Sequence, residues 1–150
     1  MTSGKYGFVI MIQDRWWQEF LHKRNSGARI LSYVRTGAAA PGEASTLLFY
    51  VTKPVGELAG HAEFIERKVG EPEEMWKDYG QESILNSKQQ YEQFLQEQRK
   101  VSFIRFKDLR EASKPIPLSN LRMLLGQRRL SRKGFYLGKG TADELILLME

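Results

Sequence analysis

Basic side chains interleaved with aromatic ones are the part of this sequence best suited to chemistry. The first basic group follows an early apolar segment and consists of Lys23, Arg24, Arg29 and Arg35. The second lies in the C-terminal third, where Arg122, Arg128, Arg129, Arg132 and Lys133 precede Phe135 and Tyr136. Cations hold phosphates and flat rings stack on bases, so this mixture is typical of proteins that bind single-stranded nucleic acid. A solvated basic loop is the competing explanation.

The charge of the chain is uneven along its length. The 150 residues carry a formal net charge of +5. Residues 1–69 hold nine Lys/Arg against six Asp/Glu and residues 100–150 hold eleven against five, whereas residues 70–99 hold three against seven. Two basic blocks therefore flank an acidic middle. A basic balance attracts polyanions such as nucleic acids, and ordinary solvation of the surface is the alternative explanation.

The sequence contains no complete catalytic or metal-binding motif. It has no cysteine, which removes disulfides, zinc thiolates and cysteine nucleophiles. The histidines His22 and His61 are far apart, and no serine lies in a nucleophile elbow. Residues 138–141, Gly-Lys-Gly-Thr, fail the phosphate-loop pattern because a glycine follows the lysine. We expect no catalytic residue, no metal site and no cofactor, which favours a binding module over an enzyme.

Length and composition indicate the number of domains and the cellular compartment of the chain. The length predicts a single domain over residues 1–150, large enough to fold without a disulfide or a metal. No apolar run approaches the roughly 20 residues that span a bilayer, and the N-terminus is not a signal peptide. The lack of cysteine fits a reducing cytoplasm. We therefore expect a cytoplasmic protein with no membrane partner, whose oligomeric state stays open.

Strand and helix signals are mixed along the chain. Apolar and β-branched segments predict strands at residues 6–12, 29–35, 46–52, 58–69, 101–106 and 134–137. Helical spacing predicts a helix capped by Asp14, one at about residues 88–98 capped by Ser87 and one at residues 142–149 capped by Thr141. It predicts further helices at residues 72–79 and 119–125. Residues 145–149 could also form a strand. Such an order does not fit a regular βαβ array and predicts an α+β fold, either a small barrel or a bent mixed sheet, with a helical insertion at about residues 71–99.

Four segments in order carry a resemblance to a known family. They are residues 26–35 (Ser-Gly-Ala-Arg-Ile-Leu-Ser-Tyr-Val-Arg), 48–55 (Leu-Phe-Tyr-Val-Thr-Lys-Pro-Val), 60–66 (Gly-His-Ala-Glu-Phe-Ile-Glu) and 74–80 (Glu-Met-Trp-Lys-Asp-Tyr-Gly). This series resembles the ASCH group of the PUA-like superfamily, particularly archaeal stand-alone members. The resemblance implies a PUA-like pseudo-barrel of five to six mostly antiparallel strands with peripheral helices. It also implies a role in binding RNA or a modified nucleotide.

The second predicted strand departs from the pattern of the hydrolytic members of that group. Many of them carry Gly-x-Lys-x-x-Glu-x-Arg, and some use the lysine and the glutamate to hydrolyse an amide of a modified nucleoside. Here Arg29 stands at the lysine position and Ser32 at the glutamate position. An arginine does not cycle a proton at neutral pH, and a serine is no carboxylate base. The resemblance thus favours a phosphate-holding role for Arg29 over catalysis.

The resemblance implies a cleft between the second strand, the turn at residues 50–55 and the inserted helices. The residues expected to bind nucleic acid are the basic residues Lys23, Arg24, Arg29, Arg35, Arg128, Arg129, Arg132 and Lys133, together with Tyr33, Tyr50, Thr52, Lys53, Trp76 and Tyr136. One alternative is an amidohydrolase acting on a modified nucleoside, with Glu63 or Glu66 as its base. Another is a protein-interaction module that uses the acidic helices at residues 71–99.

Overall fold

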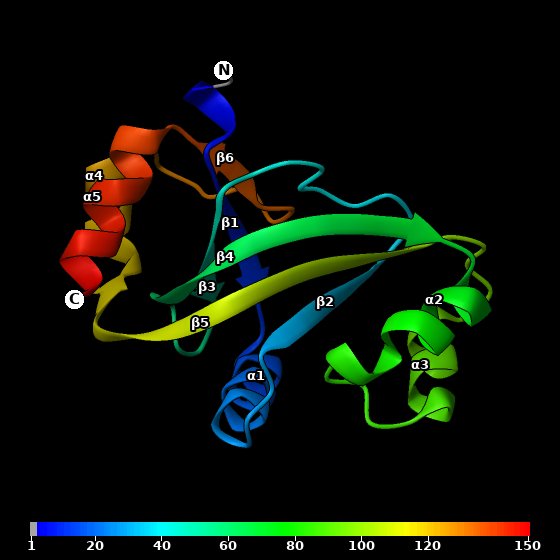
Figure 1. The fold of residues 1–150 in the computed structure, drawn as a ribbon. Helices are drawn as coiled ribbons and strands as arrows, with labels where there is room; N and C mark the ends of the chain where they lie inside the picture. Colours follow the sequence, from blue (N-terminus) through cyan, green and yellow to red (C-terminus); the bar gives the residue numbers. More distant parts are fainter. Residues whose placement is uncertain (1–2) are drawn as a thin grey trace.

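A computed structural model describes residues 3–150, and one six-stranded mixed sheet forms its centre (Figure 1). The strands are β1 (Gly7–Ile12), β2 (Ile30–Thr36), β3 (Thr46–Val51), β4 (Glu57–Gly70), β5 (Val101–Pro117) and β6 (Phe135–Leu137). They lie in the order β2-β5-β4-β3-β1-β6. The β1–β3 pair is parallel and the other pairs are antiparallel. This architecture confirms the α+β prediction, but β2 does not pair with β6 and the sheet is therefore not closed into a barrel.

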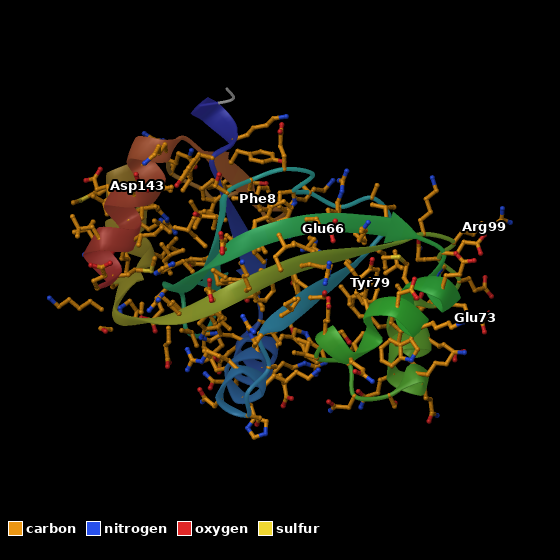
Figure 2. The ribbon with its side chains drawn as sticks, viewed as in Figure 1. Phe8, Glu66, Glu73, Tyr79, Arg99 and Asp143 are labelled. Carbon is orange, nitrogen blue, oxygen red and sulfur yellow. The ribbon has the colours of Figure 1, made fainter. Side chains whose placement is uncertain are left out.

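Helices pack against both faces of the sheet, because two core clusters use alternate residues of the same strands. They are α1 (Asp14–Asn25), α2 (Pro72–Tyr79), α3 (Lys88–Leu95), α4 (Leu118–Leu125) and α5 (Lys139–Met149), with 3-10 turns η1 (Ser3–Lys5) and η2 (Gly80–Glu82). The segment α2–η2–α3 connects β4 to β5 at one end, and α4 and α5 pack at the other (Figure 1). Glu73 and Arg99 mark the outer end of the first group, and Asp143 lies at the opposite end (Figure 2). No described helix is long and apolar enough to cross a membrane.

The first helix packs its apolar face onto the sheet. Trp17 and Phe20 of α1 are buried, and Trp17 lies with its ring centroid 5.2 Å from that of Phe49 on β3. Phe20 lies at the same distance from Phe106 on β5. Burying an aromatic or aliphatic side chain of this size contributes about 1.5–3 kcal/mol, so these contacts hold α1 firmly against the sheet. The start of α1 is thereby fixed beside the ends of β1 and β2.

Gly60 on β4 allows two elements to approach the strand closely. The register of β4 with β5 shifts between Leu58 and Gly60. A Cβ added at Gly60 would lie 2.4 Å from the carbonyl oxygen of Arg110 and 2.7 Å from the ring of Trp17. Only a glycine fits in that space, so Gly60 is the position at which β4 shifts register and approaches Trp17 closely.

Three element boundaries differ from the sequence expectation. The β5 strand does not end near Phe106 but continues to Pro117, because its last residues pair with the start of β4. The α3 helix ends at Leu95 instead of Gln98, because Gln96 has a positive φ of 56° and cannot continue a helix. The first helix contains Asp14 as its first residue, and Gln13 stands at the N-cap position instead.

The C-terminal segment is a helix and begins earlier than expected. Residues 139–149 form α5, which excludes the strand alternative for residues 145–149. The N-cap position belongs to Gly138, whose carbonyl oxygen accepts a hydrogen bond from the backbone N–H of Ala142 at 3.0 Å. Thr141 therefore lies inside the helix, and the prediction that it caps α5 is wrong.

Candidate functional site

A cleft of about 470 Å³ opens where the bent sheet brings β2 across from β1. The hydroxyl of Tyr33 on β2 donates a hydrogen bond to the carbonyl oxygen of Met11 on β1 at 3.3 Å, although the two strands are not neighbours in the sheet. The start of α1 forms one wall, and the segment after η2 together with α3 forms the roof. The remaining lining residues are Gln13, Trp16, Val34, Arg35, Thr52, Ile84, Leu85, Phe94 and Arg132.

Aromatic rings form much of the cleft wall. Tyr33 and Trp16 are half-buried, and Phe94 on α3 is 41% exposed at the rim. Burial raises the pKa of Tyr33, with nearby Arg35 opposing the shift, so its phenol stays neutral in ordinary buffers. Exposed aromatic surface at the mouth of a cleft is unusual for side chains that are mostly buried, and it offers flat faces for stacking.

A second hollow of about 430 Å³ adjoins the cleft and is strongly basic. It shares Met11, Thr52 and Arg132 with the cleft. Its other lining residues are Tyr50, Lys53, Leu118, Arg122, Arg129 and Leu130, and none of them is acidic. We call it the basic hollow.

The cations of the basic hollow are not neutralised by neighbouring carboxylates. Within residues 3–150, no Asp or Glu forms an ion pair with Lys53, Arg122, Arg129 or Arg132. Desolvation raises the pKa of the buried Tyr50 phenol at this site, and Arg122 opposes the shift. Four unpaired cations around one concave surface produce a positive potential that attracts an anion.

Half of the residues predicted to bind nucleic acid lie together at the cleft and the basic hollow. These are Tyr33, Arg35, Tyr50, Thr52, Lys53, Arg129 and Arg132. They come from β2, the end of β3, the turn that follows β3 and the loop before β6. The expected neighbourhood of the second strand, the turn at residues 50–55 and the inserted helices is the place where the cleft lies.

The structure places the other predicted residues elsewhere. Arg24 and Arg29 line a separate hollow at the end of α1, beside Lys107 and Asp108 on β5. Arg128 and Lys133 are exposed and line neither the cleft nor the basic hollow. A single groove that joins Arg29 to the C-terminal basic loop is therefore not formed by these hollows.

Three further predicted residues pack or anchor structure. Trp76 on α2 stacks against Tyr91 on α3 with ring centroids 4.7 Å apart. Tyr136 on β6 packs edge-on against Phe8 at 4.9 Å. Lys23 donates hydrogen bonds to the carbonyl oxygens of Gln81, at 2.8 Å, and Ser83. Burial lowers the pKa of Lys23, against the raising effect of Glu19 and Glu82.

Sequence reasoning missed several residues that complete the two hollows. Trp16, Ile84, Leu85 and Phe94 supply apolar surface in the cleft. Arg122, which belongs to the second basic group but was not among the residues expected to bind nucleic acid, supplies a cation in the basic hollow. Phe94 has helical spacing with the buried residues Tyr91 and Leu95, so its position in the sequence did not mark it as a cleft residue. The others lie on three different elements, and no spacing along the chain brings them together.

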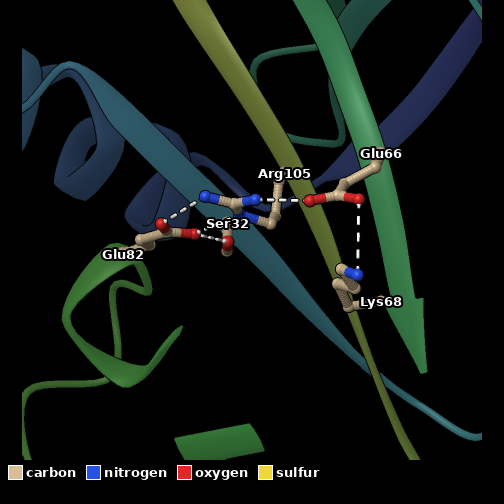
Figure 3. Close-up of polar contacts among 5 residues, drawn as sticks. All are labelled: Ser32, Glu66, Lys68, Glu82 and Arg105. Atoms are coloured by element: carbon tan, nitrogen blue, oxygen red, sulfur yellow. Dashed lines mark hydrogen bonds and ion pairs between the residues drawn. The ribbon is translucent and has the colours of Figure 1, made fainter. Parts of the chain in front are cut away.

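A polar network anchors the inserted segment to the sheet beside the cleft roof (Figure 3). Ser32 on β2 is fully buried, and its hydroxyl donates to Oε1 of Glu82 at 2.8 Å. Arg105 on β5 donates through Nε and Nη2 to the two oxygens of Glu82, at 2.8 and 2.9 Å. The pKa of Arg105 is raised above its ordinary value, and the main reason is the hydrogen bond that its side chain donates to Glu82. Bidentate pairs of this kind fix geometry as well as charge.

The same network involves a glutamate considered as a catalytic base. Glu66 on β4 accepts from Nη1 of Arg105 at 2.5 Å and lies 3.6 Å from Lys68 (Figure 3). The other candidate, Glu63, lies 3.5 Å from Lys107 and is exposed. Neither lines the cleft or the basic hollow. Both carboxylates pair with cations outside the two hollows, so the geometry does not favour the hydrolytic alternative.

The fold defines the class of the protein. An open, bent sheet of six strands with helices at its periphery is the α+β architecture that the PUA-like resemblance implied. Solved ASCH structures from Zymomonas mobilis share it. The unmodified protein aligns with a TM-score of 0.75 and 23% identity, over 95% of this chain and 94% of that one.

Two mutants of that protein are equally similar. A serine-to-alanine mutant aligns with a TM-score of 0.79 and 22% identity, over 97% of both chains. A tyrosine-to-phenylalanine mutant aligns with a TM-score of 0.77 and 23% identity, over 96% of this chain and 99% of that one. No family model matches the sequence, and no curated protein matches it. The chain has the same fold as these ASCH structures, and the archaeal stand-alone type stays a prediction.

Proposed function

We propose that this chain is a binding module for RNA, or for a modified nucleotide, and that it acts without catalysing a reaction. The observation that carries the proposal is the direct connection between the aromatic cleft and the basic hollow through Met11, Thr52 and Arg132. A nucleotide has the same two parts, a flat base and an anionic phosphate. The ASCH fold and the resemblance in the sequence add support for RNA as the ligand.

The cleft is suited to a base. Its volume of about 470 Å³ lies within the range of about 300–1,000 Å³ that is usual for small-ligand sites. A base that enters it meets the rings of Tyr33 and Trp16 and the apolar side chains of the roof. Stacking of a base on an aromatic ring contributes about 1–3 kcal/mol, which compensates an unpaired base for the loss of stacking on its neighbours in the strand.

The basic hollow is suited to the phosphate of the same nucleotide. Arg132 lines both spaces, so its guanidinium can contact a phosphate while the base lies in the cleft. Arginine donates to phosphate oxygens in pairs and keeps its charge at every physiological pH. Arg122, Arg129 and Lys53 then stabilise the next phosphate along the strand.

Fluorescence anisotropy with a labelled single-stranded RNA of about 12 nucleotides tests the proposal, since sites on single-strand binding folds span about 4–16 nucleotides. Binding should weaken linearly on a logarithmic salt scale, by a slope of about −0.7 per phosphate contact. Replacing Arg132 by alanine should reduce that slope by about one contact and weaken binding about tenfold. The matched control is Arg128→Ala, which removes the same charge from outside both hollows. Absence of salt-sensitive binding, or equal effects of the two variants, would reject the proposal.

Three other expectations stay predictions. A cytoplasmic location follows only from the amino-acid composition. A protein partner at the acidic helices of residues 71–99 is tested by deleting those helices, which should spare RNA binding if they serve only that partner. The domain organisation, one domain over residues 1–150 with that helical insertion, likewise rests on the sequence, and residues 1 and 2 lie outside the described residues.

A further inference from the structure

A third hollow continues the site on the side away from the basic hollow. It has a volume of about 510 Å³ and shares Trp16, Ile84, Leu85 and Phe94 with the cleft. Its remaining lining residues include Asn86 and Gln93, and we call it the amide hollow. The cleft is thus the middle of three adjoining spaces. A single nucleotide fills only the middle space and part of the basic hollow.

The three spaces differ in charge along their length. The basic hollow holds four cations and no acidic residue. The amide hollow holds one cation, Arg15, and one anion, Glu19, so their formal charges cancel. A phosphate is therefore favoured at the first end and disfavoured beside Glu19 at the other. A neutral ligand with hydrogen-bonding edges, such as a base, suits the amide hollow.

The amide hollow offers both a stacking platform and polar groups for a base. The guanidinium of Arg15 lies over the ring of Trp16, 3.9 Å from its centroid. Guanidinium planes and aromatic rings both stack on unpaired bases. The side-chain amide of Gln93 forms no hydrogen bond to another residue of the described chain. It is free to pair with a base edge, as glutamine and asparagine amides do.

We infer that the ligand is an extended single strand of at least two nucleotides, with one base in the cleft and a neighbouring base in the amide hollow. This inference rests on the proposed function and narrows its ligand to a single-stranded oligonucleotide, as opposed to a free nucleotide or a duplex. A duplex is disfavoured because the middle space is a cleft between β2 and the segment that holds Leu85 and Phe94, and a paired base must leave its stack to enter it.

Competition against the labelled RNA measures this directly. The competitors are AMP, the trinucleotide ApApA, and two trinucleotides that lack either one terminal base or the middle base. One additional stacked base should make ApApA bind between about fivefold and about a hundredfold more tightly than AMP. Removing one terminal base should leave most of this gain because two neighbouring bases remain, whereas removing the middle base should abolish most of it. Equal affinities of AMP and ApApA, or no loss when the middle base is missing, would overturn the inference.

Variants on α3 separate this inference from the proposed function. Gln93→Ala should weaken ApApA several-fold and leave AMP unchanged, because AMP does not reach the amide hollow. Gln89→Ala is the matched control, since Gln89 lies on the same exposed helix but lines none of the three spaces. If the labelled RNA itself does not bind, the proposed function fails. If it binds but the two glutamine variants behave alike, only the extended-strand inference fails.

Discussion

Replacing Glu82 by glutamine should loosen the inserted segment from the sheet. The carboxylate accepts two hydrogen bonds from Arg105 and one from Ser32, and the side chains of Glu82 and Arg105 are only 19% and 16% exposed. Breaking a buried ion pair costs about 3–5 kcal/mol when the remaining charge has no partner. Here Arg105 keeps Glu66 as a partner. We therefore expect Glu82→Gln to lower the free energy of unfolding by about 2 kcal/mol, the usual value of a charge-assisted hydrogen bond.

Urea denaturation followed by tryptophan fluorescence provides the measurement. Trp76 lies within the inserted segment and Trp16 borders the cleft, so the signal reports on the affected region. The control is Glu73→Gln on α2, whose ion pair with Lys88 is at the surface and leaves Glu73 84% exposed. Surface pairs contribute about 0–1 kcal/mol, so this variant should unfold almost like the unmodified protein.

The same variant should also weaken RNA binding. Ile84 and Leu85 follow Glu82 directly and form part of the cleft roof. Loosening the anchor lets the roof move, and affinity falls even though Glu82 touches no ligand. Restoring stability with an osmolyte should not restore affinity fully if the roof has lost its position. The reasoning is refuted if Glu82→Gln and Glu73→Gln have the same stability and the same affinity for RNA.

Two further predictions concern β4. Gly60→Ala should destabilise the protein by about 1–3 kcal/mol in urea, because its Cβ would collide with backbone, whereas Gly140→Ala in the first turn of α5 meets nothing and should be neutral or slightly stabilising. Burial lowers the pKa of His61 below 6.5, with Arg110 adding to the shift and Glu150 opposing it. Below about pH 6.5 the unfolded chain thus binds this proton more readily than the folded chain, so stability should fall on acidification and level off below the folded pKa. NMR titration of the His61 ring should place its midpoint below 6.5, and urea unfolding of His61→Gln should lack this pH slope. An unshifted midpoint or an unchanged slope would contradict the assignment.

Local signals predicted the elements of the fold well. The strand at 46–51 is a continuous apolar run and the helix at 72–79 starts with a proline, and both are found within one residue of the expected ends. Boundaries set by tertiary pairing were missed. Nothing in residues 107–114 resembles a strand core, because five of these eight side chains are charged, yet β5 continues through them by pairing with β4.

The candidate site was predicted only in part, for a physical reason. Tyr33 and Arg35 were identified because they share one strand, and Arg129 and Arg132 because they share one loop. Trp16 and Phe94 meet in the cleft only because the sheet bends β2 toward β1 and the insertion folds over it. Conversely, Trp76 has the residue type expected of a stacking surface, but Tyr91 already covers it. Residue type and spacing do not distinguish an aromatic ring that lines a cleft from one that packs against another ring.

The ion pair between Glu82 and Arg105 explains part of the acidic composition of the insertion. Its charge does not all face solvent, since Glu82 neutralises Arg105 between the insertion and the sheet. This leaves the roof of the cleft held by an internal ion pair while the basic hollow at the other end stays unpaired. An approaching polyanion therefore meets a positive potential at one end of the groove only. Under the proposed function, this distribution of charge would orient a bound strand with its phosphate toward Arg129 and Arg132 and its bases toward α3.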